Sequence, residues 1–368
     1  MQEKVLHVIA FDTPYPPNYG GLVDIYYKLR TLKSLDVSII LHCFYKQEKD
    51  IARLKDICKE VHLYKRKKYN VFNFLPHIVS SRLSYALINR LKQDKHPILI
   101  EGIHCTGFLL RLFKINRKIA LRTHNIEHEY YKGLAQFTNS FFRKWYYKIE
   151  SIRLERFERR IAKKIAYVFP LSHKDLLHFK EVYKNSEVQY VSAFYNDLVT
   201  VVAPKNYILL QGNFDVEENK EAANYLLKEI VAKCPEQNFV FAGKNALLNI
   251  PKNNFKNVTV VSSPSKTQMY QLNNEAKASI VYSSVNAGVK LKILNSLSAG
   301  VPVFSNKSLY LDPYLKKCVE QYSNSQELCK LIKNADRSTS LREERRRNFV
   351  SVFNLQYFGG IIIQKLLS

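Results

Sequence analysis

The sequence lacks the motifs that mark several common classes of enzyme and of secreted or membrane protein. Its six cysteines form no C-x-x-C pair and no zinc-ligand spacing, which predicts reduced, mostly buried thiols. There is no G-x-G-x-x-G or Walker loop, no G-x-S-x-G elbow, no H-E-x-x-H pair and no D-x-D. No secretory signal is visible, and no apolar run approaches the roughly 20 residues that a membrane span needs. We therefore expect a cytoplasmic protein.

Acidic residues are also scarce. The chain of 368 residues has 32 Asp and Glu against 57 Lys and Arg, a formal net charge of +25. Such an excess favours an anionic membrane surface, nucleic acid or phosphorylated ligands, but no nucleic-acid reader motif is present, so nucleic acid is not expected. Stretches 65–75 and 141–165 mix basic with bulky apolar residues, which suits a membrane surface. The alternative for 141–165 is an amphipathic helix packed on its own domain.

Strand-like and helix-like segments alternate along the chain, which is typical of α/β proteins with parallel sheets. A first series has predicted strands at 5–11, 37–44, 98–101 and 118–123 and a helix at 22–35. A second series has predicted strands at 207–211, 238–242, 258–262 and 278–282 and helices at 217–233 and 265–276. We therefore predict two similar α/β units in tandem.

The junction of the two units is expected near 190–205, which holds Pro204 and no clear periodicity. This gives a first domain at 1–195 and a second at 196–345. The basic and then apolar tail predicts a closing helix pair, of which 346–368 is expected to pack back towards the first domain.

Lys290 and Lys292 stand where helix electrostatics disfavours them. The pattern predicts a helix over 289–299, closed by Gly300. A lysine in the first turn opposes the helix dipole, at a cost of a few tenths to about 1 kcal/mol, unless an anion binds the exposed N–H groups and the lysines together. We interpret this helix start as a site for a phosphate or carboxylate. The alternative is two solvated lysines in a lysine-rich chain.

Two loops of the first domain are expected at the carboxyl ends of its strands, where open α/β sheets bind ligands. Residues 12–21 combine prolines with the pair Gly20–Gly21 directly before a helix, which lets the backbone approach a ligand. A tight structural turn is the alternative. After a later strand, residues 122–131 form a polar cluster around His124. They show no third metal ligand, so we expect no metal, and a capping role is the alternative to ligand contact.

Two loops of the second domain are expected on the same rim as the lysine pair. Residues 212–220 link a strand to a helix, with Asp215 as the predicted N-cap, and Lys244 follows the next strand. The pair Asp215-x-Glu217 superficially resembles a metal-holding motif, but an N-cap followed by an acid in the first turn explains both residues.

Three motifs in order along the chain resemble those of GT-B glycosyltransferases of the retaining family 4, the glycogen-synthase-like or group 1 superfamily. They are PPNYGG at 16–21, RTHNIE at 122–127, and 288–303, which is similar to G-x-K-x-K-x-x-E-A-x-A-x-G-x-P-V. Residues 212–221 and 241–245 also resemble transferases of Bacteroidetes surface polysaccharides. The resemblance spans most of the chain and implies an α/β fold with two Rossmann-like domains whose parallel sheets face each other across a cleft.

The resemblance also implies roles for individual residues. A nucleoside-diphosphate sugar is held mainly by the second domain and the acceptor by the first, with no cofactor or metal. Lys290 and Lys292 neutralise the diphosphate leaving group and His124 contacts the donor sugar, while retention follows from front-face attack. The further donor-binding candidates are Gly20, Gly21, Gly212, Asn213, Lys244, Gly288, Asn295 and Ser296. The acceptor-side candidates are Tyr19, Arg122, Asn125 and Glu127.

One position departs from the family pattern. The second acid of the family's E-x7-E pair, which holds the ribose hydroxyls, is Asn295 here, and the first falls on Ala287. An amide still donates and accepts hydrogen bonds, but without charge.

The activity implied by the resemblance is transfer of a sugar to a saccharide or lipid-linked acceptor in surface polysaccharide or lipopolysaccharide synthesis. We expect it at the inner face of the cytoplasmic membrane, held there by anionic lipid. The alternatives are an inactive homologue that binds a partner, a basic nucleic-acid-binding protein, and a sugar-nucleotide 2-epimerase.

Overall fold

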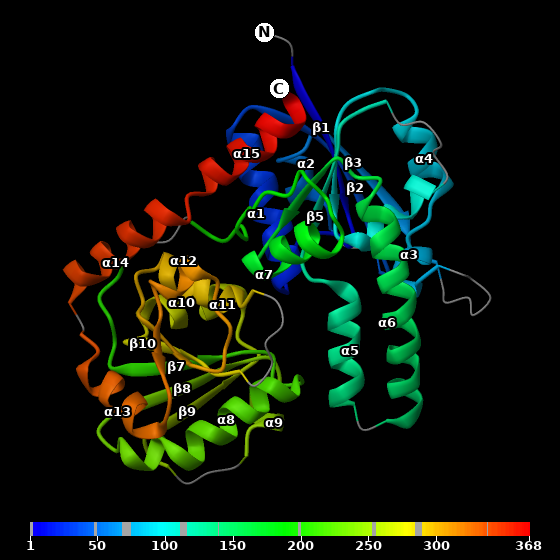
Figure 1. The fold of residues 1–368 in the computed structure, drawn as a ribbon. Helices are drawn as coiled ribbons and strands as arrows, with labels where there is room; N and C mark the ends of the chain where they lie inside the picture. The colour runs from blue at the N-terminus through cyan, green and yellow to red at the C-terminus, as the bar shows by residue number, and fades with distance from the viewer. Residues whose placement is uncertain are drawn as a thin grey trace. The chain divides into compact units, whose positions relative to one another are not determined.

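The computed structural model describes residues 3–47, 50–67, 75–110, 116–138, 140–197, 200–251, 255–283, 289–336 and 338–368. Their contacts define two units: unit 1 is Met1–Phe194 with Leu355–Ser368, and unit 2 is Tyr195–Asn354. Each unit contains a six-stranded sheet in which every strand pair is parallel (Figure 1). The prediction of an α/β chain with two parallel sheets is confirmed.

Unit 1 has the strand order β3-β2-β1-β4-β5-β6. Its strands are β1 Lys4–Ala10, β2 Val37–Tyr45, β3 Glu60–Lys65, β4 Ile98–Glu101, β5 Ile119–Thr123 and β6 Tyr167–Pro170. Its helices are α1 Gly20–Ser34, α2 Ala52–Lys55, α3 His77–Ser80, α4 Tyr85–Leu91, α5 Glu127–Phe137, α6 Phe141–Ala162, α7 His173–Leu177 and α15 Leu355–Leu367, with 3-10 and π turns at Ile103–Leu110 and His178–Val182. The last helix, α15, packs against α1, so the end of the chain belongs to unit 1.

Unit 2 has the strand order β12-β11-β10-β7-β8-β9. Its strands are β7 Tyr207–Gln211, β8 Asn238–Gly243, β9 Val258–Ser262, β10 Ala278–Val281, β11 Val303–Asn306 and β12 Glu320–Tyr322. Its helices are α8 Glu217–Glu229, α9 Ala246–Asn249, α10 Lys266–Glu275, α11 Leu291–Ser298, α12 Pro313–Lys316, α13 Ser325–Asn334 and α14 Thr339–Val352, with a 3-10 turn at Val231–Lys233.

The central strands of unit 2 are apolar because both of their faces are buried. Along β7, Ile208 and Leu210 belong to one hydrophobic cluster, while Tyr207 and Leu209 belong to another. Successive side chains of a strand point to opposite faces, so the two clusters lie on the two faces of the sheet, where helices cover it. This explains why the sequence reads as continuous apolar runs at these strands.

Both sheets have the same order of strands when each is numbered from its own first strand. The chain starts in the middle, moves outwards through two strands, and then returns to build the other half. The direction therefore reverses between β1 and β4 in unit 1 and between β7 and β10 in unit 2. Ligands of open α/β sheets bind outside the carboxyl ends of the strands at such a reversal.

One helical stretch among the described residues, Thr339–Leu367, contains an 18-residue window long and apolar enough to cross a membrane, with a mean hydropathy of 1.2. No apolar run of this length is visible in the sequence, because polar residues interrupt the stretch. The stretch breaks at Phe353 and Asn354 into α14 and α15, and 39% of its most apolar window is buried inside the protein. The helix α15 contacts α1 and β1, so its apolar side chains serve the core of unit 1.

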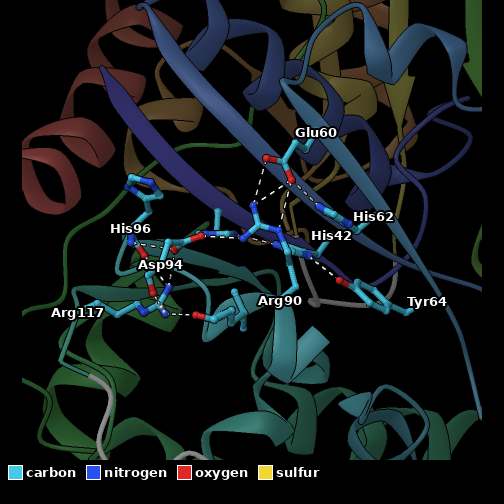
Figure 2. Close-up of polar contacts among 10 residues, drawn as sticks. His42, Glu60, His62, Tyr64, Arg90, Asp94, His96 and Arg117 are labelled. Atoms are coloured by element: carbon cyan, nitrogen blue, oxygen red, sulfur yellow. Dashed lines mark hydrogen bonds and ion pairs between the residues drawn. The ribbon is translucent and has the colours of Figure 1, made fainter. Parts of the chain in front are cut away.

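A chain of hydrogen-bonded side chains crosses β1, β2 and β3 on one face of the unit 1 sheet (Figure 2). Nε2 of His7 lies 2.9 Å from Asp94, and Nδ1 of His7 lies 2.9 Å from Nε2 of His42. Nδ1 of His42 lies 2.9 Å from the Tyr64 hydroxyl. An ionised carboxylate only accepts, so in neutral rings Tyr64 donates to His42, His42 donates to His7, and His7 donates to Asp94. Burial lowers the pKa of both histidines, that of His42 to about 2.

The acid at the end of this chain is held ionised by two arginines. Arg90 lies 2.7 Å from Asp94, and Arg117 lies 3.4 Å from it (Figure 2). Burial acts to raise the pKa of Asp94, but hydrogen bonds from Arg90 and His7 lower it to about 2. Asp94 precedes β4, and the first residue of that strand, Ile98, pairs with His7. These contacts therefore lie towards the amino end of β4, away from the carboxyl ends of the strands where ligands are expected.

Candidate functional site

The loop between β1 and α1 ends in an uncapped helix start. Tyr19 is the N-cap of α1 but makes no side-chain cap, and the first turn holds no acid. Tyr19 is 49% exposed and donates a hydrogen bond of 3.3 Å to Asp12. Gly20 is exposed, and a Cβ at Gly21 would lie 2.7 Å from the ring of Phe11. The predicted glycine pair therefore lies at the edge of unit 1 where ligands are expected, with backbone N–H groups at the helix start.

Two acids and a lysine lie buried beside this helix start. The ammonium of Lys28 lies 2.9 Å from Asp24, one turn earlier on α1, and 2.9 Å from Glu101, the last residue of β4. All three side chains are at most 1% exposed. Burial opposes ionisation of Asp24, but Arg122 and Lys28 hold its pKa below the usual range. Mutual pairing is what makes such buried charges tolerable.

Arg122, the second-last residue of β5, completes this cluster. Its guanidinium donates to Asp24 at 3.0 Å and to the carbonyl oxygens of Phe169, Val191 and Ser192. The side chain is fully buried. Arg122 therefore fixes the Asp24 carboxylate and the backbone at 169 and 191–192. It has no exposed surface with which to contact an acceptor. The acceptor-side role expected for it is not supported by this geometry.

His124 is the first residue after β5, and Asp24 and Glu101 orient its ring. Its Nε2 lies 3.3 Å from Glu101 and 3.8 Å from Asp24, and its ring packs edge-on against Phe11. The side chain is 10% exposed. Because ionised carboxylates only accept, the neutral ring carries its proton on Nε2, which leaves Nδ1 as the acceptor for a ligand.

Asp24, Glu101 and His124 are also spaced closely enough to hold a metal ion, with ligand atoms within 4.8 Å of one another. The ammonium of Lys28 already lies between the two carboxylates, and Arg122 pairs with Asp24. A divalent cation would have to displace Lys28, so we assign no metal to this cluster.

Glu127 and Asn125 differ in exposure. Glu127, in the first turn of α5, is 5% exposed, while Asn125 is partly exposed. Burial and the nearby Glu158 raise the pKa of Glu127 to about 8, against a hydrogen bond from Asn125 that lowers it. Glu127 is therefore a mostly protonated acid near neutral pH, and Asn125 is the better placed of the two to meet an acceptor.

In unit 2, the predicted helix with two lysines is confirmed as α11. Lys290 is its N-cap without a side-chain cap, the first turn holds no acid, and Gly300 follows with a φ of +70°. The ammonium of Lys290 lies 2.6 Å from Glu218 of α8. That of Lys292 lies 3.1 Å from the side-chain oxygen of Asn219 and 3.4 Å from a backbone carbonyl. One carboxylate thus faces two lysines and an uncapped helix start.

The pKa of Lys292 is lowered to about 8, mainly by burial; the Glu218 carboxylate acts to raise it and the Lys290 charge acts to lower it. An anion bound at the start of α11 would reverse the effect by favouring the ammonium form. The geometry therefore supports the interpretation of this helix start as an anion site.

Asn295 and Ser296 lie one turn further along α11. The side-chain oxygen of Asn295 is buried and has no hydrogen-bond partner among the described residues. Ser296 is fully buried and donates to Asn273 of α10 at 2.7 Å. Ser296 therefore braces α11 against α10 and does not face a ligand, whereas the side-chain oxygen of Asn295 can still accept a hydrogen bond.

The loops after β7 and β8 pack tightly against each other. A Cβ at Gly243 would lie 1.7 Å from the carbonyl oxygen of Gly212, and Gly243 has a φ of +152°, so only glycine fits there. Asn213 is exposed, and its carbonyl accepts from Asn219 at 2.9 Å. The carbonyl that Lys292 contacts belongs to Gln211, directly before Gly212, so this loop adjoins the lysine pair.

Lys244 and Asp215 pair across these loops. Their charged groups lie 3.0 Å apart, with side chains 64% and 40% exposed. The prediction of Asp215 as an N-cap is wrong: the N-cap of α8 is Val216, and Asp215 accepts from Asn245 and Lys244 instead. Gly288 lies outside the described residues, as does Ala287.

Several residues of these clusters were missed by sequence reasoning. They are Asp24, Lys28, Glu101, Glu218, Asn219 and Asn273. A usable signal existed for Asp24 and Lys28, since their i,i+4 spacing places them together on α1. Glu101 was also recognisable as a charge that ends an apolar strand.

The structure resembles known glycosyltransferases over nearly its whole length. A sucrose-phosphate synthase from Thermosynechococcus elongatus matches with a TM-score of 0.68 and 13% identity, covering 98% of each chain. A variant of S. aureus TarM in complex with UDP, α-GlcNAc-glycerol and fondaparinux matches with a TM-score of 0.68 and 11% identity over 100% of each chain. WaaG, a glycosyltransferase involved in lipopolysaccharide biosynthesis, matches with a TM-score of 0.60 and 14% identity, covering 98% of this chain and 99% of its own. The chain therefore has the GT-B fold.

A sequence relative comes from Klebsiella pneumoniae. It is a 44.6 kDa protein of the cps region, described as uncharacterized, and it is 26% identical over 313 residues, which cover 79% of each chain. No protein-family model matches the chain.

Proposed function

We propose that this protein is a glycosyltransferase that moves a sugar from a nucleoside-diphosphate sugar to a saccharide or lipid-linked acceptor. The observation that carries the proposal is the start of α11. Lys290 and Lys292 lie at this uncapped helix start, and a single carboxylate, that of Glu218, pairs with Lys290. It lies at the strand reversal of a sheet whose fold is shared with glycosyltransferases, one of which contains UDP.

Negative charge develops on the diphosphate as the sugar leaves. The two ammonium groups and the N–H groups of α11 are in place before the reaction, so they stabilise that charge without reorganisation. They supply the positive charge that a divalent metal provides in other transferases, so transfer is metal-independent in this proposal. The leaving phosphate assists removal of the acceptor proton, with retention of configuration, and His124 contacts the transferred sugar.

The acceptor belongs to surface polysaccharide or lipopolysaccharide in this proposal. The cps-region relative and the lipopolysaccharide transferase WaaG support this class. A lipid-linked acceptor supports a location at the inner face of the cytoplasmic membrane, which is part of this proposal.

Calorimetric titration with UDP, GDP and ADP, followed by transfer assays with the matching sugar nucleotides, tests the proposal. We expect one diphosphate to bind and Lys292→Ala to weaken it, while Lys228→Ala, on an exposed position of α8, leaves binding unchanged. Failure of every nucleoside diphosphate to bind the wild type, or equal binding to both variants, would refute the proposed site.

A second candidate is a GT-B homologue that binds a nucleotide sugar without transferring the sugar. The observation in its favour is Asn295, which stands where the family places an acid and whose side-chain oxygen is without a partner among the described residues. Nucleotide binding with no hydrolysis or transfer for any sugar nucleotide would support it. Recovery or gain of turnover in Asn295→Glu would show that the lost acid limits catalysis.

A further inference from the structure

Helix α6 carries apolar side chains on two different faces. Buried residues recur at Glu150, Leu154, Phe157 and Ile161, which form one face towards the core of unit 1. In the first two turns, no described side chain of α6 is buried. Figure 1 shows α5 and α6 side by side as a hairpin, and the contacts of α6 are mainly with α5. The first half of α6 therefore has only one covered side.

The exposed face of α6 holds five large apolar side chains. These are Phe141, Phe142, Trp145, Ile149 and Ile152, with exposures of 68%, 86%, 54%, 48% and 53%. At 3.6 residues per turn they lie within about 100° of the helix circumference, roughly opposite the buried face, over about 16 Å of its length. We call this surface the α6 stripe. An aligned stripe of this kind differs from scattered exposed hydrophobic residues, which need no explanation.

Basic side chains border the α6 stripe. Lys144 and Lys148 lie along one side, Arg153 lies along the other, and Arg156 lies beyond Ile152 at the end of the stripe. The ammonium of Lys148 lies 5.9 Å from the centre of the Trp145 ring. These cations have no matching row of acids, as the two acids of this part of the helix show.

Two acids, Glu150 and Glu155, lie on this part of α6, and each is paired with an arginine of the same helix. Glu150 is 1% exposed, and its carboxylate accepts from the backbone of His77 at 2.7 Å and from Arg153 at 3.1 Å. Glu155 pairs with Arg159 at 3.2 Å. Because Glu150 pairs with Arg153 and Glu155 pairs with Arg159, the positive charge that the border presents comes from Lys144 and Lys148.

We propose that the α6 stripe binds the surface of an anionic lipid bilayer. Phe and Trp side chains enter the boundary between head groups and acyl chains, and the bordering Lys and Arg groups meet lipid phosphates. The charge pattern favours lipid over a protein partner, because an apolar stripe with a cationic border and no hydrogen-bonding pattern of its own matches a surface of phosphates above hydrocarbon. The other basic stretch, 65–75, lies mostly outside the described residues and carries no part of the argument.

The chain offers an internal probe of this proposal. Trp145 is its single tryptophan, so the intrinsic tryptophan emission reports on the α6 stripe alone. Full-length protein is mixed with vesicles of phosphatidylglycerol and phosphatidylethanolamine, or of phosphatidylcholine only. We expect sedimentation with the anionic vesicles and a shift of the emission to shorter wavelength, and neither effect with phosphatidylcholine.

Two variants separate the apolar and electrostatic parts. Phe142→Ser with Ile149→Ser keeps Trp145 and is expected to weaken partitioning at least tenfold. Lys144→Gln with Lys148→Gln is expected to weaken it about 25-fold, because each basic residue near an anionic surface contributes about fivefold. The matched control is Leu247→Ser with Leu248→Ser, which removes two apolar side chains of α9 with exposures of 68% and 81% and is expected to bind as the wild type.

Unchanged partitioning of the two α6 variants, an unshifted Trp145 emission on bound vesicles, or equal loss in the control would overturn the proposal. Dimerisation of the wild type without lipid, abolished by the Phe142 and Ile149 changes in sedimentation velocity, would identify the stripe as a contact between two copies and would also overturn it. The vesicle assay contains no sugar nucleotide, so its result is independent of the proposed transfer reaction.

Discussion

Lysines lie at the strand reversal of both units, but their charges are balanced differently. In unit 1, Lys28 sits between Asp24 and Glu101, and Arg122 brings the cluster to two cations and two acids, all buried. In unit 2, Lys290 and Lys292 share one acid, Glu218, at the start of an uncapped helix.

The difference separates a positioning device from a binding site. A buried cluster that is internally neutral has no need of a ligand, and its rigidity fixes the His124 ring that it contacts. The two lysines and the helix start of unit 2 carry more positive charge than one carboxylate neutralises, so a bound anion is stabilised there. Substitutions in the two clusters should therefore have different effects: on stability in unit 1 and on ligand affinity in unit 2.

The largest effect is expected from Asp24→Asn. It leaves two buried cations with one acid, and breaking a buried pair in this way costs about 3–5 kcal/mol. We expect the melting temperature of unit 1 to fall by on the order of 10 °C in differential scanning calorimetry. Glu155→Gln removes a half-exposed acid of the same unit and should change stability by less than about 0.5 kcal/mol. Equal melting of the two variants would show that the cluster is not a buried, coupled network.

The second prediction concerns the affinity of unit 2. Lys292→Ala should weaken nucleoside-diphosphate binding by about 10- to 100-fold, since a hydrogen bond to a charged group contributes about 1.5–3 kcal/mol. Lys244→Ala removes an exposed lysine that is paired with Asp215 and should weaken it by less than about fivefold. Calorimetry measures both, and a larger loss for Lys244 would move the phosphate site to the loop after β8.

The third prediction is a gain. Glu218 forms an ion pair with Lys290, so a diphosphate has to compete with this carboxylate for the ammonium group. Glu218→Gln should therefore tighten diphosphate binding by up to about fivefold, the upper range for partly exposed ion pairs. Glu217→Gln, whose side chain is 76% exposed, is the matched control and should have no effect. Weaker binding by the Glu218 variant would assign that acid to ligand contact.

The smallest expected effect is on the pH dependence of binding. Lys292 has a lowered pKa of about 8, so it is charged below that pH and neutral above it. Diphosphate affinity should fall about fourfold between pH 7 and pH 8.5, following the charged fraction of this one group. Lys292→Arg keeps its charge over that range and should remove the trend. A pH dependence that persists in this variant would point to a different group.

Much of the architecture could be predicted from the sequence. The strand β7 has the predicted bounds, because strands covered on both faces are continuous apolar runs. The helix α11 and its end at Gly300 followed from the apolar spacing and the glycine. The edge strand β3 was not predicted, because its residues are half-buried and mostly polar.

The charged clusters were harder to predict. Asp24 and Lys28 have the spacing of an ordinary surface ion pair, and only the packing of α1 on the sheet buries them. Glu218 looks like an acid that complements a helix dipole, and its pairing with Lys290 depends on how α8 and α11 pack. Asp215 has the position of an N-cap, but the neighbouring loop offers Lys244 and Asn245, which win the competition. Tertiary contacts decide all three cases.

The line of rings from Tyr64 through His42 to His7 also sets a lower limit to the pH that the fold tolerates. Both histidines have folded-state pKa values below the ordinary 6.5, so below that value the unfolded chain takes up protons that the folded chain refuses. The contribution of these two rings to the free energy of unfolding is therefore fully present above about pH 6.5. It is lost as the pH falls, by up to about 1.4 kcal/mol per pH unit for each ring. Urea unfolding at pH 7 and pH 5 should show the loss, and His42→Gln should reduce it. Acidic solution therefore destabilises the fold through two buried rings.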